Sequence, residues 1–286
     1  MFGNETEKFI KALEALEGFR TNKFSKLSGG SINQVLFLET SEGKMVVKLN
    51  RAKEFPKMFE AEKLGLETLK SSKSFKIPEV FSVGKHQGTA YLLMEYVPQG
   101  KPVTNFWQIF AEKLAELHQN SNPYFGFPTS NYIGSLPQFN EKEITAAEFY
   151  ISQRLRPQFK LAFENGFSFE NLETVFKNIA SEIPNEKPAL IHGDLWNGNY
   201  LTTENGLPCL IDPAICYASR EIDLAMMQLF GGFPNTVFSI YDEIFPLEPE
   251  FKGRVALWQL YYLLVHLNLF GAGYLPQVKT IVSDFY

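Results

Sequence analysis

The spacing of apolar and polar residues predicts a strand-rich first third of the chain. Residues 35–40 and 45–49 are β-prone runs separated by the turn sequence Ser-Glu-Gly-Lys, which predicts a hairpin. Apolar runs at 79–83 and 89–97 predict two further strands. Between these pairs, residues 56–70 carry apolar side chains at helical spacing, which predicts one helix.

Helical periodicity dominates the rest of the chain. Residues 106–117 carry an apolar stripe at helical spacing, and Thr104 stands where it can cap that helix. Similar patterns predict helices over 142–166 and 169–183. Residues 120–140 are rich in Pro, Gly, Asn and Ser and predict a long loop, and loops of that length are often functional.

One uncharged run, residues 255–278, is long enough to raise the question of a membrane span, which needs about 20 predominantly apolar residues. Gln259, His266 and Asn268 interrupt the run, and glycines and a proline break its end. We therefore expect a buried core helix and no membrane association. The charged N-terminal sequence lacks the apolar core of a secretory signal, so we expect a cytoplasmic protein.

Composition and charge narrow the class of protein. The 286 residues are 45% hydrophobic and 21% charged, which excludes intrinsic disorder. The turn-rich sequence at 98–102 predicts a boundary between a lobe at 1–98 and a lobe at 99–286. The net charge of −5 does not suit nucleic acid, which binds a basic face. Two cysteines and four histidines do not cluster, so neither a disulfide framework nor a structural zinc site is expected.

The sequence His-Gly-Asp-Leu-Trp-Asn-Gly-Asn at 192–199 carries the clearest chemical signal. Asp194 and Asn199 are five positions apart, which is the spacing of the kinase catalytic loop. In that loop the Asp accepts the proton of the substrate hydroxyl and the Asn holds magnesium. Asp212 follows an apolar, strand-like run and stands where kinases have a second magnesium ligand. These residues predict phosphoryl transfer from Mg²⁺-ATP.

Upstream residues supply the remaining parts of a kinase site. Lys48 ends a predicted strand, as the nucleotide-binding lysine of kinases does. Glu62, on the following helix, can pair with Lys48 and orient it, and Glu60 is the alternative partner.

Two further segments suit a nucleotide. The adjacent residues Gly29, Gly30 and Ser31 precede the first hairpin, and glycines there allow backbone N–H groups to approach phosphates closely. The chain has no Walker-type P-loop motif. A strand-end segment before the break can offer backbone hydrogen bonds to adenine: Met94, Glu95, Tyr96 and Val97.

Three other polar residues are better explained as structural. His192 and His118 are expected to be packed, hydrogen-bonded histidines, and neither is expected to act as a base. Asp223 is expected to bind backbone N–H groups near the catalytic loop.

Several longer segments resemble the fructosamine/ketosamine-3-kinase family, which is related to aminoglycoside phosphotransferases and choline kinases. They include 192–199, the run DPAICYASREIDLAMMQLFGGF at 212–233, LSGGSIN at 27–33 and QRLRPQ at 153–158. The resemblance implies an α+β, protein-kinase-like two-lobed fold, with a small β-rich N-lobe and a larger, mainly helical C-lobe. It also implies ATP- and Mg²⁺-dependent phosphorylation of the sugar 3-hydroxyl of a ketosamine: a fructosamine, ribulosamine or erythrulosamine. The 3-phosphate is unstable in this family, and its breakdown frees the amine and reverses early glycation.

The resemblance also implies roles for individual residues. Asp194 is the base, and Asn199 and Asp212 bind magnesium. Lys48 holds the ATP phosphates, supported by Glu62. Trp196 lines the acceptor pocket.

The acceptor stays open at this point. The segment 212–233 favours a ketosamine, free or protein-bound, over an aminoglycoside, choline or another amino alcohol. A non-catalytic ATP-binding scaffold is disfavoured because Asp194, Asn199 and Asp212 are all present. The sequence predicts neither the preferred sugar nor the oligomeric state.

Overall fold

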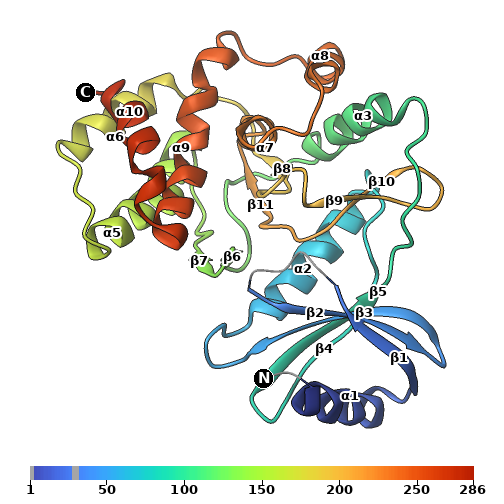
Figure 1. Ribbon diagram of the computed structural model, residues 1–286. Helices are drawn as coiled ribbons and strands as arrows, with labels where there is room; N and C mark the ends of the chain where they lie inside the picture. Colours follow the sequence, from blue (N-terminus) through green and yellow to red (C-terminus); the bar gives the residue numbers. More distant parts are fainter. Residues whose placement is uncertain (1–2, 28–31) are drawn as a thin grey trace.

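The computed structural model describes residues 3–27 and 32–286, which form a sheet-containing lobe and a larger helical lobe (Figure 1). The described part of the first lobe contains one antiparallel sheet in the order β1-β2-β3-β5-β4. Its elements are α1 (Gly3–Glu17), β1 (Thr21–Lys26), β2 (Gln34–Thr40), β3 (Gly43–Arg51), α2 (Met58–Ser71), β4 (Val80–His86) and β5 (Thr89–Glu95). The four predicted strands and the predicted helix are confirmed.

Alternation along β3 determines where Lys48 lies. Val47 and Leu49 are buried with Ile10 and Leu13 of α1 on one face of the sheet. Because successive side chains of a strand point to opposite faces, Lys48 points to the other face, where α2 packs. Strand geometry therefore directs the lysine toward the second lobe.

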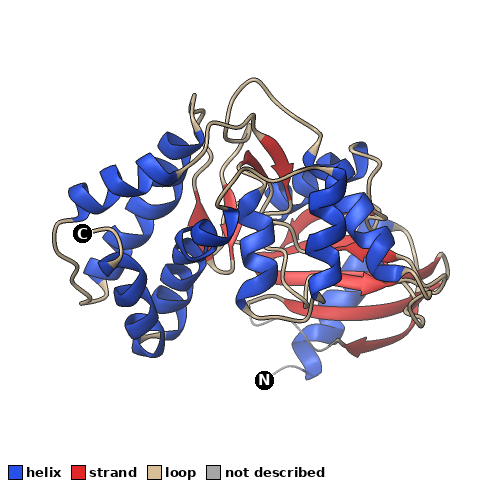
Figure 2. Cartoon of the chain, turned by 90° about the horizontal axis from the view of Figure 1, so that it is seen from above, coloured by secondary structure: helices blue, strands red, loops and turns tan. Residues whose placement is uncertain are grey.

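The second lobe is mainly helical, with short paired strands near the junction of the lobes (Figure 2). Its helices are α3 (Phe106–His118), α4 (Ala146–Phe149), the π-helix η1 (Tyr150–Leu155), α5 (Arg156–Glu164), α6 (Leu172–Glu182), α7 (Glu221–Leu229), α8 (Asn235–Ile244), α9 (Phe251–Phe270), the 3₁₀-helix η2 (Ala272–Tyr274) and α10 (Leu275–Ser283). Its strands are β6 (Asn131–Ile133), β7 (Leu136–Gln138), β8 (Ala189–Ile191), β9 (Tyr200–Thr202), β10 (Pro208–Leu210) and β11 (Cys216–Ala218).

The uncharged C-terminal run forms the buried core helix that its pattern predicts. Helix α9 buries Trp258 and most of its other apolar side chains, as expected of a helix that is apolar on all sides. It ends at Gly271, whose φ of +91° stops the helix. No helix of the described residues is both long and apolar enough to cross a membrane.

The structure differs from the sequence prediction in several places. Thr104 does not cap α3, which begins after Asn105 without a side-chain cap. The predicted helix over 142–166 begins later, at a capping box on Thr145, and continues through the π-helix η1. The predicted long loop contains the short β6–β7 hairpin. Strand β1 was not predicted, because its mostly exposed sequence, Thr-Asn-Lys-Phe-Ser-Lys, has little apolar patterning.

The junction of the lobes is a packed interface. Strand β5 ends at Glu95 and α3 begins at Phe106, so the turn-rich segment lies between them. Leu92 and Met94 of the sheet belong to the same buried cluster as Phe110 of α3. The boundary at residue 98 stays a prediction.

Candidate active site

The segment 192–199 forms the loop between β8 and β9, and Asp223 of α7 holds its first turn. The Asp223 carboxylate accepts hydrogen bonds from the backbone N–H of His192 (2.7 Å) and of Gly193 (2.8 Å). Gly193 has a φ of +81°, and a Cβ there would lie 2.1 Å from the carbonyl oxygen of Ala214. The glycine therefore allows this loop and the segment around Ala214 to approach closely.

His192 and His118 are structural, as the sequence indicated. The Nε2–H of His192 donates to the carbonyl of Ile211 (2.8 Å), and its Nδ1 accepts from the backbone N–H of Asp194 (3.3 Å), so the ring is neutral. Burial also lowers the pKa of the imidazole. His118 is buried between the hydroxyl of Tyr241 (2.8 Å) and the carboxylate of Asp223 (3.3 Å). Neither ring lines the two cavities described below.

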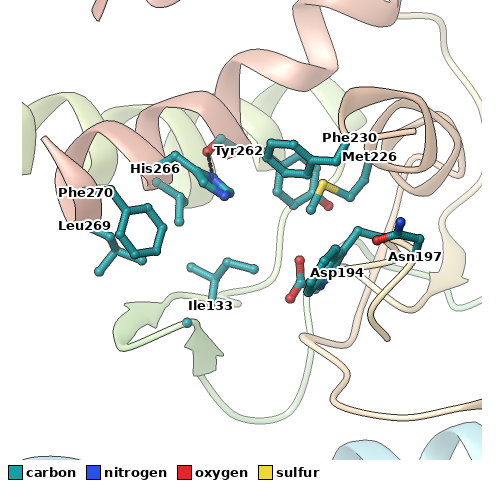
Figure 3. Close-up of a pocket in the computed structure, with 12 residues that line it drawn as sticks. Ile133, Asp194, Asn197, Met226, Phe230, Tyr262, His266, Leu269 and Phe270 are labelled. Atoms are coloured by element: carbon teal, nitrogen blue, oxygen red, sulfur yellow. Dashed lines mark hydrogen bonds between the residues drawn. The ribbon is translucent and has the colours of Figure 1, made fainter. Parts of the chain in front are cut away.

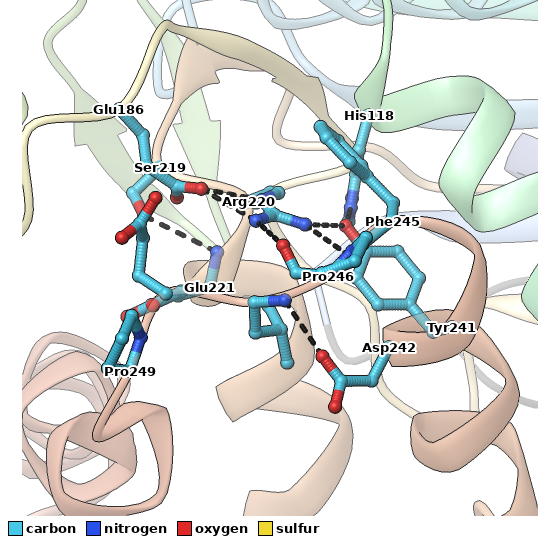
Figure 4. Close-up of polar contacts among 12 residues, drawn as sticks. His118, Glu186, Ser219, Arg220, Glu221, Tyr241, Asp242, Phe245, Pro246 and Pro249 are labelled. Atoms are coloured by element: carbon cyan, nitrogen blue, oxygen red, sulfur yellow. Dashed lines mark hydrogen bonds and ion pairs between the residues drawn. The ribbon is translucent and has the colours of Figure 1, made fainter.

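A cluster of buried ion pairs fixes the start of α7, and with it Asp223 (Figure 4). Arg220 donates to Glu186 (2.6 Å) and to the carbonyls of Phe245 and Pro246. Glu221 is fully buried and accepts from Arg254 and from the indole N–H of Trp258 (2.7 Å).

We expect Asp223→Ala to lower the free energy of unfolding by about 3–5 kcal/mol, because it leaves two buried N–H groups and His118 without their acceptor. Urea unfolding measures the change. Asp284→Ala, at an exposed position of the last turn, is the matched control and should change stability by less than about 0.5 kcal/mol. Equal midpoints for the two variants would contradict the assigned role of Asp223.

Asn199 orients Asp194. The Asn199 side-chain N–H donates to the backbone carbonyl of Asp194 (2.8 Å) and to its carboxylate (3.0 Å). Burial raises the pKa of Asp194 to about 7, assisted by the charge of Asp212 and opposed by the hydrogen bond from Asn199. A carboxyl group with this pKa changes its protonation state near neutral pH and is suited to accept a proton.

Lys48 lies between two carboxylates that come from distant parts of the chain. Its Nζ is 2.5 Å from Glu62 of α2 and 2.5 Å from Asp212. Burial opposes the charge of Lys48, but the charges of Asp212 and Glu62 outweigh it and raise the pKa above its ordinary value. Glu60 instead lies 3.7 Å from Lys85 at the surface, so the ion pair with Lys48 is made by Glu62.

Asp212 occupies a turn between β10 and β11 that the sequence did not reveal. Its φ of +56° is in the left-handed region, which Asp adopts more readily than most residues and which concentrates at functional sites. The N–H of the preceding Ile211 donates to the carbonyl of Asn199 (3.0 Å). This bond fixes the Asp212 turn beside the catalytic loop.

The donor atoms at this position fit Mg²⁺ shared with a phosphate chain. The Nδ2 of Asn199 is committed to Asp194, which leaves its Oδ1 as a ligand, and Oδ1 of Asp212 contacts Lys48, which leaves its Oδ2. Residues 3–27 and 32–286 contain no group of three or more His, Cys, Asp or Glu side chains that would hold a metal unaided. Magnesium commonly takes one or two protein ligands and completes its shell with phosphates and water.

Two cavities meet at Asp194. The first, of about 200 Å³, is lined by Lys48, Glu62, Asn199 and Asp212, and we call it the nucleotide-side cavity. The second, of about 400 Å³, is the acceptor-side cavity (Figure 3). Asp194, Trp196 and Gly134 line both. A carboxylate at this junction can reach groups bound on either side.

Trp196 is partly exposed at the same junction. Its indole packs so closely over Gly198 that a Cβ there would lie 2.4 Å from the ring. Because Gly198 has no Cβ, the Trp196 indole can lie at the junction of the two cavities.

The predicted adenine-binding segment lies at the end of β5, where Met94 and Val97 are buried. The Glu95 side chain binds Lys76 (2.6 Å), and the N–H of Tyr96 faces the carbonyl of Lys44 (3.4 Å). Contact with adenine stays a prediction. Gly29, Gly30 and Ser31 lie outside the described residues.

Much of the acceptor-side cavity was missed by sequence reasoning. Its wall is formed by the β6–β7 hairpin, α7 and α9. The lining residues not singled out for it include Ile133, Met226, Phe230, Tyr262, His266, Leu269 and Phe270. In the sequence, His266 stands out no more than Gln259 and Asn268, the other two polar residues that interrupt the same apolar run.

Comparison with known proteins places this arrangement among sugar-amine kinases. The family model described as fructosamine kinase matches residues 4–286. A probable ketoamine kinase of Synechocystis sp. is 38% identical over 93% of this chain and 91% of its own length. The chloroplastic protein-ribulosamine 3-kinase of Arabidopsis thaliana is 34% identical over 92% of this chain and 82% of its own.

Solved structures agree on the fold. A candidate fructosamine-3-kinase from Haemophilus somnus 129PT has a TM-score of 0.88, with 28% identity over 96% of each chain. An aminoglycoside phosphotransferase has a TM-score of 0.65 at 18% identity, covering 96% of this chain and 97% of its own, which supports the fold alone. The predicted α+β, two-lobed kinase-like fold is therefore confirmed, and the chain belongs to the fructosamine kinase family.

Proposed function

We propose that this protein is an ATP-dependent kinase that phosphorylates the sugar 3-hydroxyl of a ketosamine. The observation that carries the proposal is the position of Asp194 at the junction of two cavities, one lined by Lys48, Asn199 and Asp212 and the other mainly apolar. ATP would occupy the first cavity and the sugar-amine the second. Family membership supports the same activity.

In the proposed reaction, the oxygen of the sugar 3-hydroxyl attacks the γ-phosphorus of ATP, and Asp194 accepts the proton of that hydroxyl. The new bond joins this oxygen to phosphorus, the bond between the γ-phosphorus and its bridging oxygen breaks, and ADP leaves. Asn199 keeps the Asp194 carboxylate oriented toward the acceptor. The proton on Asp194 then passes to water, which restores the base.

Lys48, Asn199 and Asp212 would hold the nucleotide phosphates and their metal. Magnesium, when bound, would neutralise charge on the transferring phosphoryl group. Lys48 supplies a fixed positive charge, and Glu62 restricts its position. The segment 94–97 would bind adenine through its backbone.

Two alternative functions are less well supported. Aminoglycosides carry several positive charges, but among the described residues that line the acceptor-side cavity Asp194 is the only acid. This composition favours an acceptor with a single amine. A non-catalytic scaffold has no need of a carboxylate such as Asp194 at the junction of the two cavities.

An acceptor panel with Mg²⁺-ATP tests the function. We expect ADP release with a fructosamine or ribulosamine, little with choline or an aminoglycoside, and slow release of the free amine as the 3-phosphate decomposes. This outcome fits a cytoplasmic repair enzyme for glycated amines, free or protein-bound. ADP release with an aminoglycoside and none with any ketosamine would exclude the proposal.

The ion pair of Lys48 gives a matched pair of variants. We expect Glu62→Gln to lower kcat/KM for ATP by about 10-fold or more, because it replaces the carboxylate that pairs with Lys48 by a neutral amide, which holds the ammonium group less firmly. Glu60→Gln, on the same helix, should change this value less than twofold, because Glu60 contacts only Lys85 at the surface. Steady-state kinetics at saturating acceptor measure both, and similar losses in the two variants would refute the assigned partner.

A further inference from the structure

The acceptor-side cavity contains a histidine whose hydrogen-bonding state is set by its neighbours. His266 lies on α9, and its Nδ1 is 2.7 Å from the backbone carbonyl of Tyr262 (Figure 3). A carbonyl oxygen can only accept, so Nδ1 carries the hydrogen and donates. In a neutral imidazole the second nitrogen, Nε2, is then a hydrogen-bond acceptor.

The surroundings of His266 favour its neutral form and hold its ring in place. Burial lowers the pKa of His266, and this outweighs the opposing effect of the bond to Tyr262. The rings of Phe230, Phe270 and Tyr274 lie at centroid distances of 4.9, 5.4 and 5.1 Å. No described residue forms an ion pair with His266.

The cavity around His266 suits one positive charge. Phe230, Phe270 and Trp196 line it, and aromatic faces attract cations. The polar groups of the neighbouring Tyr262 are already committed: its carbonyl to His266, and its hydroxyl to the Gly193 carbonyl (2.7 Å). A secondary ammonium group only donates, so it matches an Nε2 that only accepts.

We propose that His266 is a substrate-positioning residue, and that its Nε2 accepts a hydrogen bond from the protonated amine of the acceptor. This inference rests on the proposed function and assigns recognition of the amine to α9, while Asp194 acts on the sugar hydroxyl. Figure 3 shows His266 and Asp194 on different parts of the wall of the same cavity. Two contacts from separate elements would orient the sugar so that its 3-hydroxyl faces the base.

A pair of acceptors that differ in one atom tests the proposal. One is 1-deoxy-1-propylaminofructose, and the other is 1-O-propylfructose, in which an ether oxygen replaces the amine. Wild-type protein should prefer the amine. His266→Phe keeps an aromatic ring but removes the acceptor, so the ratio of kcat/KM for amine over ether should fall about 10–100-fold. His266→Gln, whose side-chain amide can still accept, should recover part of this preference.

The outcomes separate this inference from the proposed function. If the wild-type protein turns over the amine and His266→Phe has the same amine-to-ether ratio of kcat/KM as the wild type, the role of His266 is overturned and the proposed function stands. A parallel loss for both acceptors would show that His266 serves the sugar or the local fold, and would equally overturn the assigned contact. Failure of wild-type protein to turn over either acceptor would remove the proposed function and this inference together.

Discussion

Asp194→Asn is expected to lower kcat by about 10³-fold or more while nucleotide binding persists. The amide cannot accept the proton of the attacking hydroxyl, and general bases typically contribute about 10²–10⁴ in rate. The substitution preserves size, and it leaves in place the ion pair of Lys48 with Asp212, the two residues that would hold the phosphates. ADP release measures kcat, and calorimetric titration with Mg²⁺-ATP measures binding.

The control for this variant is Asp284→Asn, an identical chemical change at an exposed position. It should retain wild-type kcat. Turnover of Asp194→Asn within tenfold of wild type would refute the base assignment. Loss of ATP binding together with turnover would show that Asp194 serves the nucleotide instead.

The raised pKa of Asp194 predicts a dependence on pH with a definite sign. The folded protein holds a proton on Asp194 up to about pH 7, whereas the unfolded chain loses it near pH 4, so this group lowers stability progressively as pH rises between these values. Asp194→Asn removes the effect. In metal-free buffer, the melting temperature of the Asp194→Asn protein minus that of the wild type should therefore rise from pH 4 to pH 7 and then level off.

Activity should follow the opposite trend, because only the ionised carboxylate accepts a proton. In the wild-type protein, kcat/KM for the acceptor should increase with pH through an acidic limb as Asp194 ionises, and an acceptor titration across pH measures it. A stability difference that stays constant across this pH range would show that Asp194 titrates at its ordinary pKa in the folded protein.

Lys48→Met is expected to produce the second large effect, a loss of about 10²-fold or more in kcat/KM for ATP. A unit charge 4 Å from a phosphate contributes about 4 kcal/mol before desolvation at an effective dielectric constant of 20. The same change leaves the carboxylates of Glu62 and Asp212 without their shared cation. The nucleotide-free protein should therefore also lose stability.

A double variant separates the two consequences of losing Lys48. Lys48→Met with Glu62→Gln removes one of the two carboxylates, so it should recover part of the lost stability but none of the activity. Lys85→Met, whose partner Glu60 lies at the surface, is the control and should behave as wild type. Recovery of activity in the double variant would contradict the proposed contact of Lys48 with phosphate.

The predictable parts of the site are those encoded by local spacing. Asp194 and Asn199 lie on one short loop, so their separation in sequence fixes their proximity. Lys48 was singled out by its place at the end of a predicted strand, and the expected contacts of Asp223 with backbone N–H groups are present. The choice between Glu60 and Glu62 was not predictable, because both lie on α2 and only the docking of that helix decides which one faces Lys48.

The acceptor-side cavity could not be predicted because it has no local signature. Ile133, Phe230 and His266 come from three distant segments, and each resembles an ordinary core residue in sequence. The left-handed backbone of Asp212 depends on the meeting of β10 and β11 with the catalytic loop. Such features follow from tertiary packing, which outweighs local propensity.

The proposed reaction is tested most directly by identifying the phosphorylated atom with ³¹P and ¹H NMR of the product formed from a fructosamine and Mg²⁺-ATP. We expect one phosphate, coupled to the proton on sugar carbon 3, in the wild-type reaction and none detectable over the same time with Asp194→Asn. A phosphate on another oxygen, or the same product formed by the Asp194→Asn protein within tenfold of the wild-type rate, would contradict the proposed reaction.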